Sequence, residues 1–118
     1  MALHSDLPIY KLCFDLLGVA TDITRNMPRD LKNTLGSKIQ SHCIDMLALI
    51  ARANIAKQKA PHIEEMLEHQ HIAEFLLRLA HEKKFISHGQ WAAAAKLLGT
   101  LGKQAGGWLK QSRSASVA

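Results

Sequence analysis

The seven histidines of this sequence are the side chains that most suggest metal chemistry. Glu68 and His71 have the Glu-x-x-His spacing that places two metal ligands on one side of a helix in di-iron proteins. Such a centre needs two pairs of this kind and a glutamate from each of two further helices, and the sequence offers one pair. We therefore predict no metal site and no cofactor, with the histidines solvated or at the rim of a core.

Nucleophilic or redox chemistry has equally little support in the residue pattern. The two cysteines, Cys13 and Cys43, belong to no Cys-x-x-Cys pair. The sequence lacks the Gly-x-Ser-x-Gly motif of serine hydrolases, and its C-terminal glycines do not form a phosphate-binding loop. We predict that the chain is not an enzyme and that both thiols are buried. A turn near Pro28 would also allow the two thiols to face each other across a helical hairpin.

Positive charge is the strongest compositional feature, and it is unevenly distributed. The 118 residues carry a formal net charge of +5. Residues 31–60 and 87–118 each carry a net charge of +4, whereas residues 1–30 carry −1 and residues 61–86 carry −2. Basic surfaces of this kind commonly bind polyanions such as nucleic acid.

Lysines repeat at a spacing of seven in the last third of the chain. Lys96, Lys103 and Lys110 would lie along one line of a helix, because seven residues are close to two turns. No acidic residue follows Glu82. A second basic line follows the second predicted helix and comprises Lys38, Arg52 and Lys59, interrupted by Asp45. Lys32 and Lys57 add charge close to the two ends of that helix.

Three interpretations of these basic lines are open at this point. In the first, the lysines form a solvated surface, as charged helix faces usually do. In the second, they bind phosphates without regard to base sequence, which gives a steep salt dependence. In the third, the basic corners of one subunit meet the acidic corners of the next and set the register of a ring or stack.

Apolar periodicity predicts four helices, over about 8–26, 30–57, 61–84 and 88–111. Pro8 suits the first turn of a helix, and Ser87 and Gln90 form a capping box before the last one. Residues 112–118 are predicted to fray. No segment alternates with a period of two. Because the turns are short, the sequence predicts one all-α domain over residues 1–118, folded as an up-down-up-down antiparallel four-helix bundle.

Glycine and tryptophan near the end of the fourth predicted helix indicate a contact surface. A glycine costs roughly 1 kcal/mol against alanine in a helix, so several of them need a compensating gain. We predict that Gly102, Gly106, Gly107 and Trp108 permit close packing or docking of a partner. Apolar side chains beyond a single stripe on the second and third predicted helices favour assembly as well: Ile44, Leu49, Ile55, Ile72, Phe75 and Leu79.

The sequence also bears on location. No apolar run reaches the ~18 residues of a membrane span. The first residues lack the basic and apolar regions of a signal peptide. We therefore expect a cytoplasmic protein with no membrane partner.

Four segments carry a family resemblance: residues 7–11 (LPIYK), 27–39 (MPRDLKNTLGSKI), 76–81 (LLRLAH) and, most specific, 102–110 (GKQAGGWLK). They resemble the accessory variability proteins of diversity-generating retroelements. These proteins belong to a wider group of small four-helix bundles, which includes proteins encoded by intervening sequences of 23S ribosomal RNA genes. The resemblance covers nearly the whole chain. The chain departs from that family in two respects. Trp91 stands where we expect the family to have a tyrosine, and residues 61–84 are more acidic and richer in histidine than we expect of a member.

The resemblance implies a non-enzymatic protein that forms a pentameric barrel with a basic surface. It implies binding to the reverse transcriptase of the retroelement and to nucleic acid, RNA or DNA, in support of mutagenic copying of a template repeat into a variable gene. Carried onto this chain, it points to seven basic residues as candidates for nucleic-acid binding: Lys32, Lys38, Arg52, Arg78, Lys96, Lys103 and Lys110.

The sequence therefore predicts an accessory binding protein of a diversity-generating retroelement. One alternative is a bundle protein associated with 23S ribosomal RNA intervening sequences, which would share the fold and differ in partner. An alternative of another class is a metal- or redox-active helical bundle.

Overall fold

The computed structural model describes residues 3–117, and the side chains of residues 3–115. Its four long helices are α1 (Pro8–Arg25), α3 (Ser37–Ile55), α4 (Ala60–Glu82) and α5 (His88–Val117). Three short helical segments complete it: η1 (His4–Asp6), α2 (Arg29–Leu31) and the π-helical η2 (Lys32–Gly36). No strand occurs between residues 3 and 117, so the predicted all-helical class is confirmed for this part of the chain.

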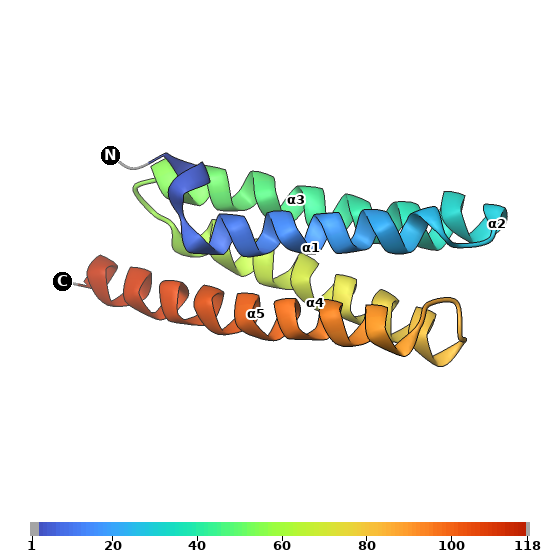
Figure 1. The fold of residues 1–118 in the computed structure, drawn as a ribbon. Coiled ribbons are helices and arrows are strands. Elements are labelled where there is room, and N and C mark those ends of the chain that lie inside the picture. The colour runs from blue at the N-terminus through green and yellow to red at the C-terminus, as the bar shows by residue number, and fades with distance from the viewer. Residues whose placement is uncertain (1–2, 118) are drawn as a thin grey trace.

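The long helices lie side by side along a molecule of 50 × 21 × 20 Å (Figure 1). Helices α1 and α4 each contact both α3 and α5. In Figure 1, α1 and α4 begin at the end of the molecule where both termini lie, whereas α3 and α5 begin at the opposite end. The two most basic helices, α3 and α5, therefore occupy diagonal positions, with α1 and α4 between them.

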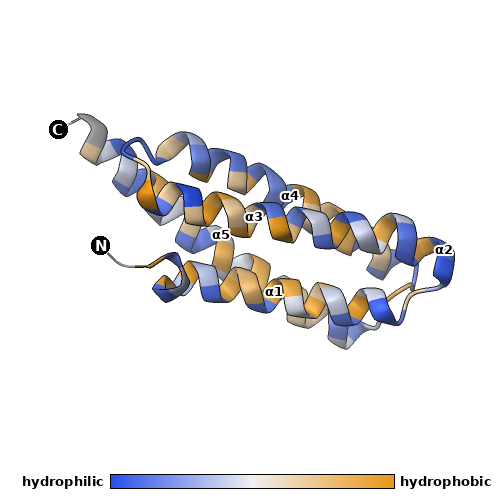
Figure 2. Cartoon of the chain, turned by 90° about the horizontal axis from the view of Figure 1, so that it is seen from above, coloured by the Kyte–Doolittle hydropathy of each residue, from blue (hydrophilic) through white to orange (hydrophobic). Residues whose placement is uncertain are grey.

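The core consists of the apolar faces that the four helices turn toward one another. In α1 the buried residues Ile9, Cys13, Leu16, Ala20 and Ile23 recur every three or four positions. In Figure 2, hydrophobic orange segments recur along α1 and α3 with hydrophilic blue segments between them, as expected of amphipathic helices. Burial of these faces stabilises the fold by about 25 cal/mol per Å² of apolar surface. No described helix is both long enough and apolar enough to cross a membrane.

The turn between α1 and α3 brings two segments of backbone close together. Gly36, the last residue of η2, is buried against Thr24 of α1. A Cβ atom at Gly36 would lie 2.6 Å from Thr24 Cγ2. The Thr24 hydroxyl donates to the carbonyl oxygen of Ala20 at 2.7 Å and also lies 3.4 Å from the carbonyl oxygen of Gly36. Sequence periodicity assigns no role to Gly36, although a larger residue there would displace Thr24.

A lysine side chain caps the second long helix. Helix α3 ends at Ile55, and the Lys59 ammonium group donates to the carbonyl oxygens of Ala53, Asn54 and Ala56 at 2.9–3.0 Å. The last carbonyl groups of a helix lack the N–H donors that a further turn would supply, so a cation there is favourable. Lys59 therefore caps the C-terminus of α3. The prediction that Lys59 lies on a basic line of this helix was wrong.

The last helix begins as predicted and ends later. The capping box is confirmed, because the Gln90 N–H donates to Ser87 Oγ at 3.1 Å and the Ser87 N–H donates to Gln90 Oε1 at 2.9 Å. The frayed tail predicted for residues 112–118 is wrong for residues 112–117, which continue α5, and Ala118 lies outside the described residues. Arg113 Nη2 donates to Glu64 Oε1 of α4 at 2.8 Å. This contact joins the final turns of α5 to α4, and the periodicity of the sequence did not predict it.

Candidate functional site

The lysines of α5 form a regular basic feature that we call the α5 lysine line: Lys96, Lys103 and Lys110. All three are exposed, and their seven-residue spacing places them along one side of the helix. Within residues 3–115, none of them forms an ion pair with a carboxylate. Their ammonium groups are therefore open to an anionic partner.

The basic residues around α3 are more scattered. Lys38 and Arg52 are exposed on α3, and the half-exposed Lys32 lies in η2. Asp45, on the stretch of α3 between them, is exposed and lies 3.9 Å from His69 of α4. Because α3 and α5 occupy diagonal positions, these residues and the α5 lysine line form two separate basic regions on one chain.

Arg78 differs from the α5 lysine line because it has partners of its own. Its Nη2 atom lies 3.7 Å from Glu74 Oε2, one turn earlier on α4. Its guanidinium group lies 6.0 Å from the centre of the Trp91 ring, and Trp91 stacks on His81 with ring centres 5.5 Å apart. The charge of Arg78 is thus partly balanced and its side chain is held against α5.

The glycines of α5 do not share one role. Gly102 faces the buried Gln70 of α4, whose Nε2 would lie 3.5 Å from an added Cβ and donates to the carbonyl oxygen of Leu98 at 3.3 Å. At Gly106 and Gly107 an added Cβ would meet nothing within 4 Å beyond the adjacent helix backbone. The prediction that close packing within the chain explains why positions 106 and 107 are glycine is therefore wrong. Docking of a partner on them stays a prediction.

Trp108 is partly buried against the core and borders two open grooves. One groove, of about 280 Å³, is also lined by Lys57 and Lys59 of the loop that follows α3. The other, of about 300 Å³, is also lined by Pro8 at the start of α1 and by Gly107. The tryptophan thus separates a basic loop from the first turn of α1.

Both cysteines are free and completely buried between α1 and α3, as predicted. The Cys13 thiol donates to the carbonyl oxygen of Cys43 across a distance of 3.7 Å. Burial raises the pKa of each thiol to about 12, and for Cys13 the neighbouring Cys43 adds to this effect. Thiols that stay protonated and inaccessible at neutral pH are poor nucleophiles. Cys13 and Cys43 therefore serve as core residues.

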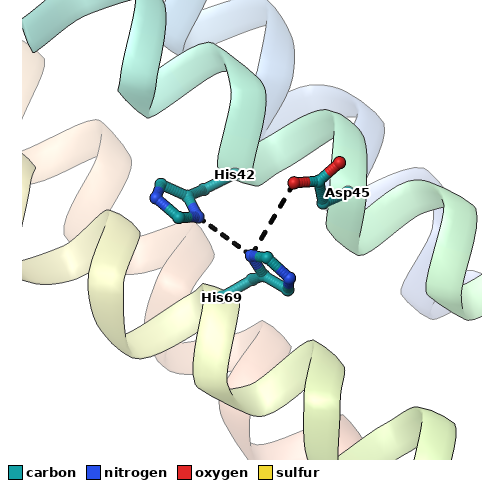
Figure 3. A group of neighbouring side chains, drawn as sticks. All are labelled: His42, Asp45 and His69. Atoms are coloured by element: carbon teal, nitrogen blue, oxygen red, sulfur yellow. Dashed lines mark hydrogen bonds and ion pairs between the residues drawn. The ribbon is translucent and has the colours of Figure 1, made fainter.

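One group of potential metal ligands was not predicted from the sequence: His42, Asp45 and His69 (Figure 3). His42 Nδ1 and His69 Nδ1 are 2.9 Å apart, and His69 Nδ1 is 3.9 Å from Asp45 Oδ2. Burial lowers the pKa of His42, the adjacent His69 lowers it further, and Asp45 partly opposes both effects.

The available sequence signal for this group was incomplete. His42 and Asp45 are three residues apart, which places them on the same side of a helix. Their partner His69 is 27 residues from His42 and on another helix, so only the packing of α3 on α4 brings it near. Glu68 and His71, whose spacing first suggested a metal ligand pair, are both exposed and do not belong to the group.

Comparison with known protein families gives a match over most of the chain. A family model described as bAvd-like matches residues 9–112. The chain belongs to the bAvd-like family. This agrees with the resemblance to accessory variability proteins of diversity-generating retroelements, a family of accessory and non-catalytic type. A comparison with curated proteins gives no match.

The bAvd-like match includes every residue that the resemblance pointed to for nucleic-acid binding. It also includes Trp108, the α5 glycines and the group of His42, Asp45 and His69. It ends one residue before Arg113. The candidate nucleic-acid-binding residues therefore all lie inside the part of the chain that the family model matches.

Proposed function

We propose that this chain is a non-enzymatic, cytoplasmic accessory protein of a diversity-generating retroelement. In this role it binds the reverse transcriptase and nucleic acid and supports mutagenic copying of the template repeat. Membership of the bAvd-like family supports the accessory role. The observation that carries nucleic-acid binding is the α5 lysine line, three exposed cations without a carboxylate partner among the described side chains.

The geometry of the α5 lysine line suits a phosphate backbone. A helix rises about 1.5 Å per residue, so lysines seven apart are about 10.5 Å apart and the line extends for about 21 Å. Each ammonium group that meets a phosphate releases condensed counterions, which favours binding at low salt and weakens it at high salt. The contact is sequence-independent, because an ammonium group on a phosphate does not touch the bases.

Assembly is the second part of the proposal. The chain folds as a single up-down-up-down antiparallel four-helix bundle, and several copies form a ring, a pentamer by family resemblance. Support comes from large apolar side chains that one chain leaves exposed: Phe14, Ile44, Ile55, Ile72, Phe75 and Leu79. Leu49, which was predicted to be one of them, is buried and belongs to the core. Gly106, Gly107 and Trp108 form a further surface that suits a protein partner.

Nucleic-acid binding is tested by removing the charge of the α5 lysine line. The triple variant Lys96→Gln, Lys103→Gln, Lys110→Gln should bind single-stranded RNA and DNA more weakly in fluorescence anisotropy. Its plot of log affinity against log salt should be shallower by about 2, since each of the three lost phosphate contacts on a single strand lowers the slope by roughly 0.7.

A matched control removes the same charge elsewhere. Lys11, Lys83 and Lys84 are also exposed, on α1 and at the end of α4, and their replacement by glutamine should change the salt slope much less. Equal losses in the two triple variants would show that net charge, and not the line, drives binding.

Partner binding and assembly need separate measurements. The reverse transcriptase of the same element should co-purify with the chain, and light scattering should give a mass above that of one chain. A clean monomer at micromolar concentration contradicts assembly. A chain that retains ribosomal RNA and ignores the reverse transcriptase would favour the alternative of a 23S ribosomal RNA-associated protein.

A further inference from the structure

The imidazole rings of His42 and His69 face each other across the contact between α3 and α4 (Figure 3). Asp45 lies one turn along α3 from His42, on the same side of the helix, and its carboxylate points toward His69. We propose that these three side chains bind Zn²⁺, or a divalent transition-metal ion of similar ligand preference, and that the ion links α3 to α4.

The distances between the ligand atoms are close to those around one shared ion. Zinc binds histidine nitrogen and carboxylate oxygen at about 2.0–2.2 Å, so two ligands of one ion lie at most about 4.3 Å apart and about 3.4 Å apart in a tetrahedral site. The two Nδ1 atoms are 2.9 Å apart, and Asp45 Oδ2 is 3.9 Å from His69 Nδ1. All three ligand atoms lie within 4.8 Å of one another. A small rotation of the Asp45 side chain, which is 52 % exposed, completes the set.

The donor atoms determine which ions fit. Imidazole nitrogen is a ligand for Zn²⁺, Co²⁺, Ni²⁺ and Cu²⁺, whereas Ca²⁺ and Mg²⁺ are bound by oxygen atoms. Two neutral imidazoles and one carboxylate give the group a charge of −1, which favours a cation. Three protein ligands leave a fourth position for water, or for a group from a bound partner. This position lies on the solvent side, because Asp45 is exposed and both histidines are only partly buried.

The two helices hold the ligands before any ion arrives. His42 and Asp45 share a rigid helix, and His69 lies on α4, which packs directly on α3. The side chain of His69 is 23 % exposed, so its rotamer freedom is limited by its neighbours. Ordering the ligands therefore costs little at the moment of binding. A hydrogen bond between the two imidazoles accounts for the 2.9 Å contact alone, whereas one shared ion accounts for both this contact and the 3.9 Å approach of Asp45 to His69.

The test uses tag-free protein that has been treated with EDTA and dialysed. Titration calorimetry with ZnCl₂ should show one ion per chain, and a saturating amount should raise the Tm by several degrees, because an ion that binds only the folded state stabilises it. CaCl₂ and MgCl₂ should do neither. CoCl₂ should produce the visible absorption of nitrogen- and oxygen-ligated Co²⁺.

Variants assign the ligands. His42→Gln and His69→Gln should each lower the affinity for Zn²⁺ at least tenfold, and Asp45→Asn, which keeps the shape of the side chain, should lower it by a smaller factor. His71→Gln and His88→Gln are matched controls at histidines outside the group, and they should leave the affinity unchanged. Circular dichroism should show that each variant keeps its helix content.

Two results would overturn the proposal. One is the absence of a one-to-one Zn²⁺ complex in the unmodified chain. The other is unchanged affinity in the double variant His42→Gln, His69→Gln, which would mean that the ion binds elsewhere. If a histidine variant fails to fold, the Asp45→Asn result and the Co²⁺ spectrum of the unmodified chain decide the question, because neither requires that variant.

Discussion

Gly36 and Gly106 have helical backbones and opposite surroundings. Gly36 has φ −60° and ψ −44°, and no described glycine has a positive φ. The backbone conformation therefore does not require glycine at either position. A Cβ at Gly36 would lie 2.6 Å from Thr24 Cγ2, whereas a Cβ at Gly106 would meet nothing within 4 Å beyond the adjacent helix backbone. Packing inside the chain requires glycine at the first position and not at the second.

The difference shows what a glycine in a helix can and cannot indicate. Each one costs roughly 1 kcal/mol against alanine, and a cost of this kind suggests a compensating contact. At Gly36 the compensation is visible, because η2 lies directly against α1. At Gly106 and Gly107 we find no compensating contact within the described chain, so we expect the compensation to come from a partner.

The largest effect is expected at Gly36. Gly36→Ala should destabilise the fold by about 1–3 kcal/mol, because the new methyl group overlaps the stiff, buried side chain of Thr24. Urea unfolding followed by circular dichroism measures this. Gly18→Ala is a matched control in α1, where a Cβ meets nothing within 4 Å, and it should stabilise the fold. Equal stability of the Gly36 variant and the unmodified chain would show that this contact is not tight.

A second substitution distinguishes overlap from other causes. Thr24→Ser removes Cγ2, the atom that a Cβ at Gly36 would approach most closely, and keeps the hydroxyl that donates to Ala20. Combined with Gly36→Ala, it should restore part of the lost free energy of unfolding. A purely additive pair would mean that the two residues do not interact.

The α5 glycines should respond in the opposite direction. Gly106→Ala and Gly107→Ala should each raise the free energy of unfolding of the chain by about 0.5–1 kcal/mol, because alanine is the better helix former and the new methyl group is unobstructed. The same variants should weaken assembly or reverse-transcriptase binding, measured by light scattering and co-purification. A gain in stability with both interactions intact would remove Gly106 and Gly107 from the partner surface. Gly102→Ala should have a smaller effect, because Gln70 is already at contact distance.

The fold was predictable from the sequence to the extent that it depends on residues near one another in the chain. The spacing of Ile9, Cys13, Leu16 and Ala20 specifies which face of α1 is buried, and Ser87 with Gln90 specifies where α5 begins. Such features depend on one helix and its own side chains. Helix periodicity does not give the axial position of one helix against the next.

The contacts that escaped prediction all cross between segments. Gly36 meets Thr24, His42 meets His69, and Lys59 folds back on the end of α3. In each case the residue types are common and their separation in sequence is irregular. The α5 lysine line, by contrast, needed only a seven-residue repeat on one helix, and its exposure follows from the same periodicity.

The smallest effect is expected at the end of α5, beyond the glycines. The ion pair of Arg113 with Glu64 joins side chains that are 60 % and 49 % exposed, and pairs of this kind contribute at most about 1 kcal/mol. Arg113→Ala should therefore leave global unfolding nearly unchanged and should speed amide hydrogen exchange only in the turns after Gln111. Arg52→Ala, at an exposed arginine that has no ion pair in the described part of the chain, is the control. If exchange in those last turns stays slow in the Arg113 variant, the helix end is held by its own propensity or by a neighbouring subunit, and the contrast with the tightly packed Gly36 region becomes weaker.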